Sequence, residues 1–368
     1  MRQAPFEGVK GALGFGCMRF PKVGDEVDRA QVSDMIDAFM DAGFNYFDTS
    51  YIYLGGQSEL ILRECLTQRY ERESFVLADK LSDWVFEKEE EVLPLFEKQL
   101  EQCGVDYFDV YFFHSITKSG YEKHLRCNTF EIVQKLKAEG KVRHIAMSFH
   151  DEPELLDRIL TDHPCIEMVQ LQINYLDYDD PTVQSKACYD VAVKHGKPVI
   201  VMEPIRGGLL ATPPAQAAEL LDAVGGSYAS IALRYAAGFD EVFMVLSGMS
   251  SVEMVRENVQ TFAPFVPLSP QELAIVDRVR PIIRESRQIP CTKCNYCADV
   301  CPKRIAISDI FSAYNGYLTA RLSAAQAKEQ LPAGASLKDC IGCGKCEEVC
   351  PQSIDIRKKL KRAGFELL

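Results

Sequence analysis

FVLADKLSDWVFEKEEEVLPLFEKQLEQCGVDYFDVYFFHS, residues 75–115, contains two apolar runs separated by a helical pattern. The runs 75–78 and 110–113 are short and rich in aromatic and branched residues, which is typical of strands buried on both faces. Between them, residues 87–102 place apolar side chains at helical spacing. This order predicts two parallel strands joined by a crossover helix.

The same alternation extends over residues 1–250. Further apolar runs lie at 13–16, 44–47, 145–148, 169–173, 199–202 and 243–246, and further helical patterns lie at 29–42, 129–138 and 181–195. Eight strands alternating with helices predict an α/β fold, a (β/α)8 TIM barrel. The alternative is a doubly wound open sheet. Such a sheet normally has a Gly-rich phosphate turn after its first strand, and Gly11, Gly14 and Gly16 have the wrong spacing for one.

Eight of the 14 cysteines lie near the end of the chain, in two copies of one pattern. They are Cys291, Cys294, Cys297 and Cys301, followed by Pro302, and Cys340, Cys343, Cys346 and Cys350, followed by Pro351. Each copy has the spacing of a bacterial two-cluster ferredoxin, in which three thiolates hold one 4Fe–4S cube and the fourth reaches the other cube. We therefore assign Cys350 to the cube of the first copy and Cys301 to that of the second.

A pair of zinc sites is the alternative for these cysteines, because zinc held by four cysteines also uses two-residue gaps. Zinc requires neither three closely spaced thiolates in a row nor a trailing Cys-Pro, and here the whole pattern occurs twice. The sequence therefore favours two iron–sulfur clusters. A helix is expected near residues 323–330, between the two copies.

Length and charge divide the chain into two parts. We expect a barrel at 1–265, a helical connector at 266–287 and a ferredoxin-like domain at 288–368. Residues 1–287 carry a net charge of −16 and residues 288–368 one of +4, which together give the −12 of the chain. No basic, aromatic-studded surface for nucleic acid is evident. Without a membrane-length apolar run or a secretory signal, we expect a soluble, cytoplasmic protein.

Three successive strands of the predicted barrel each end in a polar residue. Asp48, Lys80 and His114 follow the second, third and fourth runs, and Tyr53 comes five residues after Asp48. Catalytic groups of such barrels lie at the carboxyl ends of strands and in the loops after them. Each of these residues alone would more often be structural. Together on one rim they predict an active site.

These residues lie in segments that resemble the aldo/keto reductases. FDTSYIYLGGQSE (47–59), Lys80 and YFFHS (111–115) carry the likeness, and GKVRHIAMS (140–148), VQLQINY (169–175) and SGMSSVEMVRENV (247–259) extend it. The likeness covers about residues 1–265. With the cysteine-rich end, the chain resembles the ferredoxin-fused branch of that family.

The resemblance implies reduction of a carbonyl by hydride from NADPH or NADH, so that NADP or NAD is the cofactor. Tyr53 would be the general acid, Lys80 would supply a positive charge beside it, and Asp48 would hold Lys80 in place. His114 would orient the carbonyl oxygen. This division of roles is also chemically consistent, because a free tyrosine, with a pKa of ~10, holds its proton too tightly without a neighbouring cation.

The resemblance also implies a nicotinamide site. Ser148 and Gln172 would meet the carboxamide, and the other implied cofactor residues are Gly16, Met202, Gly248, Ser250, Glu257 and Asn258. Three positions depart from the family pattern. Phe149 replaces an amide-binding Asn, Met202 replaces an aromatic residue that stacks on the nicotinamide, and Met254 replaces an Arg that contacts the adenosine 2′-phosphate. His150 and Trp84 are further candidates for the pocket.

Three hypotheses of function follow. The first is an NAD(P)H-dependent oxidoreductase acting on a small carbonyl or alcohol, with its electrons linked to two 4Fe–4S clusters. In the second, the clusters or a flavin donate electrons to the substrate, and the nicotinamide site is altered. In the third, the chain is a non-catalytic electron carrier or docking subunit. A redox protein is a candidate partner, whereas nucleic acid and membranes are not expected.

Overall fold

The fold is taken from a computed structural model, which describes residues 2–24, 26–331 and 339–367. Its contacts divide the chain into two units. The first comprises residues 1–173, 177–204 and 233–267, and the second comprises residues 174–176, 205–232 and 268–368. The second unit thus contains the segment after the strand that ends at Met202 as well as the cysteine-rich end.

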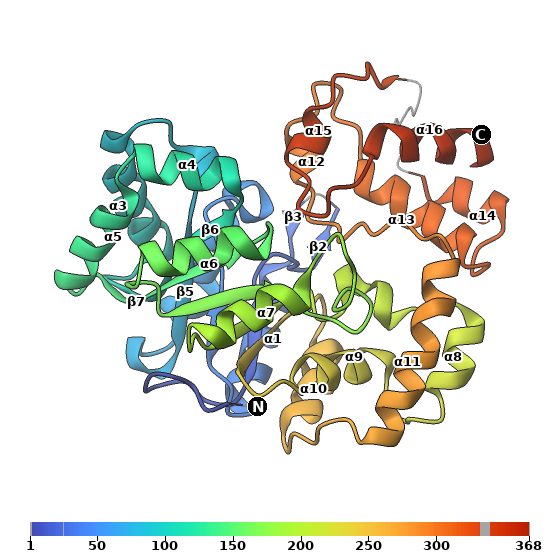
Figure 1. The fold of residues 1–368 in the computed structure, drawn as a ribbon, viewed down its shortest axis with the longest axis horizontal. Helices are drawn as coiled ribbons and strands as arrows, with labels where there is room; N and C mark the ends of the chain where they lie inside the picture. The colour runs from blue at the N-terminus through green and yellow to red at the C-terminus, as the bar shows by residue number, and fades with distance from the viewer. Residues whose placement is uncertain (1, 25, 332–338, 368) are drawn as a thin grey trace. The chain divides into compact units, whose positions relative to one another are not determined.

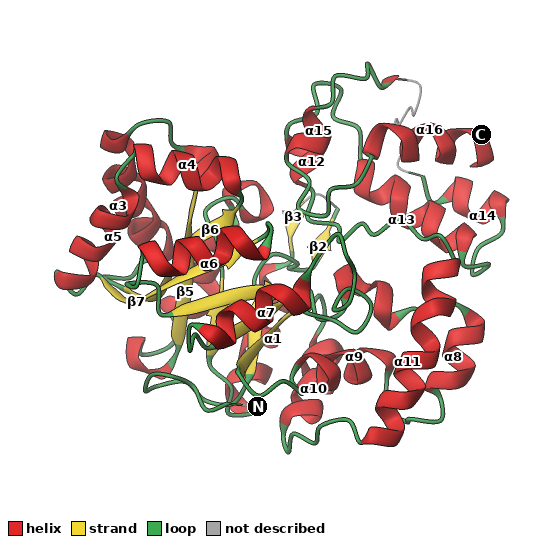
Figure 2. Cartoon of the chain, in the orientation of Figure 1, coloured by secondary structure: helices red, strands yellow, loops and turns green. Residues whose placement is uncertain are grey.

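The first unit is a closed barrel of eight parallel strands, in the order β1-β10-β9-β8-β7-β6-β5-β4. The strands are β1 (Leu13–Gly16), β4 (Tyr46–Asp48), β5 (Val76–Ser82), β6 (Phe108–Ile116), β7 (Val142–Phe149), β8 (Met168–Gln172), β9 (Val199–Met202) and β10 (Val242–Gly248). Figure 2 shows these strands in yellow, enclosed by helices. The predicted TIM barrel is confirmed, and each of the eight apolar runs overlaps one strand. A small antiparallel pair, β2 (Lys22–Val23) and β3 (Glu26–Val27), lies outside the barrel.

Helices follow the strands of the first unit. They are α1 (Arg29–Asp41), α2 (Ser58–Leu62), α3 (Val92–Cys103), α4 (Lys118–Arg126), α5 (Thr129–Ala138), α6 (Pro153–Asp162), α7 (Ser185–Lys194) and α10 (Val252–Phe262), and α9 (Tyr228–Ala236) is divided between the two units. In Figure 1, α3 to α7 lie around the ends and outer faces of β5, β6 and β7. The Asp28 side chain caps α1 by accepting a hydrogen bond from the Gln31 N–H, and Gly104 ends α3 in a left-handed conformation.

Two helices begin later than the sequence predicts, and side-chain hydrogen bonds explain both differences. The pattern at 87–102 becomes α3 only from Val92, because Glu91 turns back and accepts the N–H of Glu87 at 2.7 Å. The pattern at 181–195 becomes α7 only from Ser185, because Asp180 accepts the N–H of Thr182 at 2.8 Å. Acidic side chains that bond to nearby backbone N–H groups compete with the regular helix at these two points.

The second unit is helical throughout its regular elements. These are α8 (Ala215–Leu221), α11 (Pro270–Glu285), α12 (Tyr296–Asp299), α13 (Ile307–Leu318), α14 (Ala324–Glu329), α15 (Lys345–Glu348), α16 (Ile356–Leu367) and the 3₁₀ helix η6 (Arg206–Ala211). Helix α14 lies where a helix was expected near 323–330, and α11 lies within the predicted connector. The core around the cysteines includes Ile305, Ile307, Phe311, Ile354, Ile356 and Leu360.

Candidate functional site

Three neighbouring strands bring polar side chains to one rim of the barrel. Asp48 is the last residue of β4, Lys80 lies near the end of β5, and His114 lies near the end of β6. Parallel pairing of β4 with β5 and of β5 with β6 puts these positions at the same carboxyl-terminal edge. Tyr53 begins the short helix η1 (Tyr53–Gly56), which follows β4. The structure therefore brings together all four residues that the sequence singled out.

Lys80 is the charged centre of this group. Its ammonium Nζ donates to Asp48 Oδ1 at 2.6 Å and to the Thr49 carbonyl oxygen at 2.6 Å, and it lies 5.0 Å from the centre of the Tyr53 ring. The Lys80 side chain is only 1% exposed. Burial raises the pKa of Asp48, while the charge of Lys80 acts in the opposite direction. The ion pair thus fixes a positive charge beside the Tyr53 phenol.

His114 is held as a neutral ring. Burial, together with the positive charge of Lys80, lowers the pKa of His114 well below its ordinary value, and His150 adds a smaller effect of the same sign. Its Nδ1 lies 3.2 Å from Ser50 Oγ and 2.5 Å from Ser82 Oγ. When one of these hydroxyls donates to Nδ1, the ring proton is on Nε2, which can then donate to a bound oxygen.

Two aromatic rings pack against the His114 imidazole. The Tyr53 ring meets it nearly at a right angle, with 5.9 Å between ring centres, and the Trp84 indole lies 5.8 Å away. Trp84 is 40% exposed, so it also borders solvent. The Trp84 indole is therefore placed to form one wall of a pocket next to the four polar residues.

The sequence pointed to neither Ser50 nor Ser82, although both stand within two residues of candidates. Ser50 follows Asp48 by two residues, and Ser82 pairs in register with His114. Serine is common in loops, and only the three-dimensional pairing reveals that both hydroxyls converge on one imidazole nitrogen.

A buried carboxyl pair, which no local sequence pattern marks, lies behind Lys80. Asp79 Oδ1 accepts the Lys80 backbone N–H at 2.7 Å and the Gln99 side-chain amide at 3.1 Å, and the same amide donates to Glu59 at 3.3 Å. Burial and the neighbouring charge of Asp79 raise the pKa of Glu59 to about 11, and burial raises that of Asp79 to about 6. Glu59 therefore stays protonated at neutral pH and Asp79 carries the single negative charge.

The predicted nicotinamide residues continue around the same rim. In the barrel order, Gly16 pairs with Gly248, and Met202 pairs with Gln172. The Ser148 hydroxyl accepts the backbone N–H of Ser115 at 2.6 Å, and the Gln172 amide donates to Asp177 at 2.7 Å.

The predicted contacts for the adenosine end of the cofactor lie after β10. The Ser250 hydroxyl donates to the carbonyl oxygen of Arg19 at 2.8 Å, and the Asn258 amide donates to Ser247 Oγ at 3.0 Å. Glu257 is exposed on α10. The Arg19 side chain covers Gly248, since a Cβ added there would lie 2.7 Å from Arg19 Cδ.

The positions that depart from the family pattern are also visible. Phe149 is buried at the end of β7, and Met202 is partly buried at the end of β9. Met254 is 49% exposed, and its sulfur lies 3.5 Å from the Ser250 nitrogen. These side chains offer no hydrogen-bond donor to an amide or a phosphate.

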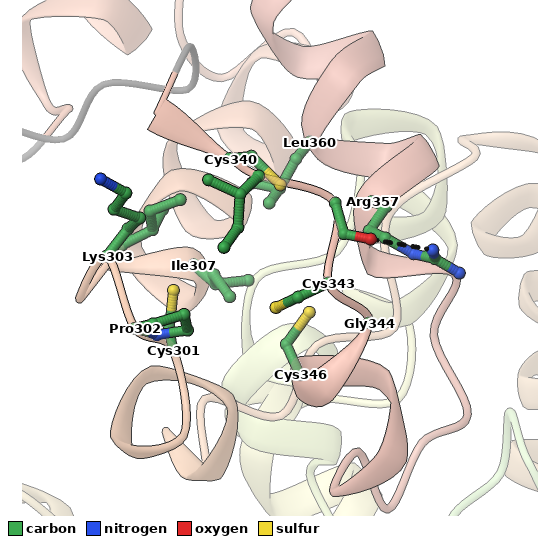
Figure 3. Close-up of a pocket in the computed structure, with 13 residues that line it drawn as sticks. Cys301, Pro302, Lys303, Ile307, Cys340, Cys343, Gly344, Cys346, Arg357 and Leu360 are labelled. Carbon is green, nitrogen blue, oxygen red and sulfur yellow. Dashed lines mark hydrogen bonds between the residues drawn. The ribbon is translucent and has the colours of Figure 1, made fainter.

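The cysteine-rich end gathers its thiols into two groups. Cys301, Cys340, Cys343 and Cys346 line one pocket, and Figure 3 shows the four side chains around it. In the other group, the thiols of Cys294, Cys291 and Cys350 lie close enough to Cys297 to add to burial in raising its pKa, and Cys346 of the group that lines the pocket adds the smallest effect. In each group, the fourth cysteine comes from the other copy of the motif.

None of the helices in residues 2–24, 26–331 and 339–367 combines the length and the apolar character that a membrane span requires.

Comparisons with known proteins agree with this architecture. Among curated proteins, the chain is 29% identical over 273 residues to an L-galactose dehydrogenase of Arabidopsis thaliana, and the match covers 67% of this chain and 83% of that protein. It is 24% identical over 280 residues to an uncharacterized oxidoreductase of Bacillus subtilis, with 67% and 86% covered.

Among solved structures, an aldo-keto reductase from Klebsiella pneumoniae in complex with NADPH gives a TM-score of 0.60 at 22% identity. The likeness covers 73% of this chain and 91% of that chain. A holo-form aldo-keto reductase from Bacillus halodurans gives a TM-score of 0.61 at 24% identity, over the same shares. At such identities the likeness demonstrates a common fold.

Family models match both parts of the chain. Residues 290–355 match the model of a 4Fe-4S dicluster domain, which confirms the predicted iron–sulfur region. Residues 12–281 match the model of the aldo/keto reductase family. Because that match spans well over half of the sequence, the chain is an oxidoreductase that belongs to the aldo/keto reductase family.

Proposed function

We propose that this chain interconverts a carbonyl compound and its alcohol with NADPH or NADH at the barrel rim, and that its C-terminal region binds two 4Fe–4S clusters. The observation that carries the proposal is the arrangement of Lys80, Asp48, Tyr53 and His114. The Lys80–Asp48 ion pair is buried, and the Lys80 ammonium lies against the phenol ring. Water therefore screens the positive charge of Lys80 only weakly.

The four residues divide the proton chemistry among them. Tyr53 gives its phenolic proton to the carbonyl oxygen as that oxygen gains negative charge, and the Lys80 charge stabilises the phenolate left behind. Asp48 holds Lys80 in place through the 2.6 Å hydrogen bond. His114, neutral and backed by Ser50 and Ser82, donates a hydrogen bond that orients the carbonyl and stabilises the developing charge.

Residues at the rim fit a nicotinamide cofactor. The Ser148 hydroxyl, already held by the Ser115 N–H, can donate to a carboxamide oxygen, and Gln172 lies on the neighbouring strand β8, where it pairs with Met202 of β9. Gly16 and Gly248 pair in register and neither has a side chain, while the Arg19 side chain lies over Gly248. When bound, a reduced nicotinamide would supply the hydride. The NADPH of the Klebsiella pneumoniae relative supports this choice.

The cysteine groups fit iron–sulfur clusters by their chemistry. Each group offers four soft thiolate donors at one place, which is the ligand set of a 4Fe–4S cube. A nicotinamide moves two electrons together, whereas each cluster exchanges one at a time. Electron exchange between the clusters and the barrel chemistry is therefore a separate part of the proposal, and a redox protein is the proposed external partner.

The test is an anaerobic assay of the full, cluster-reconstituted chain. Oxidation of NADPH or NADH would be followed with a panel of carbonyl compounds, in the wild type and in Tyr53→Phe. We expect nicotinamide oxidation that depends on the carbonyl and is lost in the variant. Turnover with a reduced viologen, but with neither nicotinamide, would instead favour a cluster-fed or flavin-dependent reductase. No turnover with any donor would favour an electron-carrier or docking role.

A further inference from the structure

The cysteine-rich end consists of two equivalent halves, residues 291–308 and 340–357. Beside the four cysteines, the halves share a Val, a Pro and two Ile at matched positions, and the four Ile side chains lie in one core. The backbones also match. The pairs Lys293 and Gly342, Asn295 and Gly344, and Arg304 and Ser353 all have positive φ. The two halves can therefore be compared position by position.

One matched position has a similar structural task in both halves. Ser308, at the end of the first half, donates a hydrogen bond to the Asn295 side chain in the first cysteine loop. Its counterpart Arg357, which is labelled in Figure 3, donates to the Gly342 carbonyl oxygen at 3.3 Å and to Glu347 at 2.9 Å. Because Glu347 offsets much of the Arg357 charge, Arg357 acts mainly to hold the loop.

A second matched position differs in net charge. Lys303 follows Cys301 by two residues, and it lines the pocket of Cys301, Cys340, Cys343 and Cys346. The residue in the same place after Cys350 is Gln352, which is uncharged. Among the described residues that line the pocket, none is acidic. At this position the second cysteine group has a cation and the first a neutral amide, whereas between the first two cysteines of each loop the first group has Lys293 and the second has Gly342.

The second cysteine group is also more exposed to solvent than the first. Cys340 and Cys343 are exposed, whereas the matched Cys291 and Cys294 are partly buried. The residue after the first cysteine of each loop shows the contrast most clearly, since Ile341 is 61% exposed and Thr292 is 2% exposed. Reduction adds one negative charge to a cluster. A nearby cation and nearby water both stabilise that charge and raise the reduction potential.

We propose that the two clusters have unequal reduction potentials, with the cluster of Cys301, Cys340, Cys343 and Cys346 the higher, and that Lys303 sets part of the difference. An electron that the first cluster gives up is then taken by the second, with no proton transferred and no bond broken. In the chain reduced by one electron, that electron therefore resides mainly on the second cluster. This inference rests on the proposed binding of two clusters.

The test is a redox titration of the anaerobically reconstituted full chain, followed by electron paramagnetic resonance. Two variants form a matched pair, because Lys303→Gln gives the second site the residue of the first and Gln352→Lys does the reverse. We expect two midpoints in the wild type. Lys303→Gln should lower the upper midpoint and leave the lower one in place, whereas Gln352→Lys should raise the lower midpoint.

Two further observations complete the design. Cys301→Ala should remove the signal with the upper midpoint, which ties that midpoint to the second site. The gap between midpoints should narrow at high salt, because counterions screen an exposed lysine. Two full clusters with one shared midpoint, or a Lys303→Gln change that moves the lower midpoint, would overturn this inference alone. Iron and sulfide amounting to fewer than two clusters per chain would overturn the proposed cluster binding as well.

Discussion

At the scale of single residues, the proposed chemistry depends on one buried charge. Lys80 is surrounded by Asp48, the Thr49 carbonyl oxygen and the Tyr53 ring, and it is almost wholly buried. A buried ammonium is stable only with such partners, because desolvation of an unpaired charge is costly. Asp48 therefore has two effects that cannot be separated, since its carboxylate compensates the charge of Lys80 and it keeps Lys80 in place.

The first prediction concerns the phenol. Replacing Tyr53 with Phe removes the proposed acid and leaves the ring packed on His114 and Lys80. We expect kcat to fall by roughly 10²–10⁴-fold, the usual contribution of a positioned general acid. The measurement is the steady-state rate of nicotinamide oxidation with a carbonyl substrate.

A neighbouring tyrosine provides the control for this change. Tyr51 lies two residues earlier, and its hydroxyl accepts a hydrogen bond from the exposed Lys98 at 2.8 Å. Tyr51→Phe should leave kcat within a few-fold of the wild type. Equal activity of the two variants would show that the Tyr53 proton takes no part in turnover.

The second prediction concerns the protonated carboxyl behind Lys80. In the unfolded chain Glu59 ionises near its ordinary pKa, whereas in the folded chain its pKa is raised to about 11. The folded state therefore binds one more proton above pH ~4.5, and this group makes stability fall as pH rises. Gln cannot ionise, and its amide can replace the acid proton as a donor to Asp79. The stability of Glu59→Gln relative to the wild type should thus increase from pH 5 to pH 8.

The measurement for Glu59→Gln is the difference in Tm from the wild type at each pH, with equal cluster content. The upper limit of the effect is about 1.4 kcal/mol per pH unit. Glu64→Gln is the control, because Glu64 lies five residues further along in a half-exposed pair with Arg29. Its difference from the wild type should be small and nearly flat. If the Tm difference between Glu59→Gln and the wild type is also independent of pH, Glu59 is ionised in the folded protein.

At the scale of elements, the turn at η6 packs closely against a cysteine loop of the second unit. Gly207 has φ +63°, and a Cβ there would lie 2.4 Å from the Thr292 Cα. Thr292 stands between the first two cluster cysteines, Cys291 and Cys294. Glycine is required here for two reasons, the left-handed conformation and the close approach of another backbone.

The third prediction separates these two reasons. Gly208 also has a positive φ, +93°, but a Cβ there would have no atom within 4 Å. Gly208→Ala should destabilise the unit by about 1–2 kcal/mol through backbone strain alone. Gly207→Ala should add roughly 1–3 kcal/mol of overpacking.

The readout for both glycine variants is the anaerobic rate at which a chelator removes iron from the reconstituted chain. Gly207→Ala should lose iron faster than Gly208→Ala, because only the first change displaces the loop of Cys291 and Cys294. Equal rates would mean that the Thr292 contact does not support the cluster.

At the scale of the whole molecule, the crossed assignment of the cysteines makes the fourth prediction. Cys301→Ala should disturb the cluster of Cys340, Cys343 and Cys346, whereas Cys350→Ala should disturb that of Cys291, Cys294 and Cys297. Each variant should lose roughly half of the iron, or convert one cluster to a three-iron form. Mössbauer or electron paramagnetic resonance spectra would show which signal changes. Loss of the same signal in both variants would contradict the crossed assignment.

The barrel was predictable from sequence because its strands are buried on both faces. Continuous apolar runs such as 110–113 therefore mark the strands without any knowledge of their neighbours. Helix starts were less predictable. The onset of α3 depends on the Glu91 side chain, which bonds to the backbone one turn earlier.

The candidate site was predictable only where a residue stands at a strand end. Asp48, Lys80 and His114 satisfy that rule, and the resemblance to a family supplied Tyr53. The residues Ser50, Ser82, Glu59 and Gln99 support them through contacts between segments far apart in the sequence. Such contacts depend on how the strands are paired, and no local pattern encodes them.

The measurement that tests the central claim most directly is the transfer of labelled hydrogen. The reconstituted enzyme would be given nicotinamide cofactor deuterated at both C4 positions, together with the carbonyl compound that turns over fastest. The account predicts an alcohol with one deuterium on its carbinol carbon from the wild type, and little product from Tyr53→Phe. An alcohol formed without deuterium, at a rate that instead follows a one-electron donor, would contradict it.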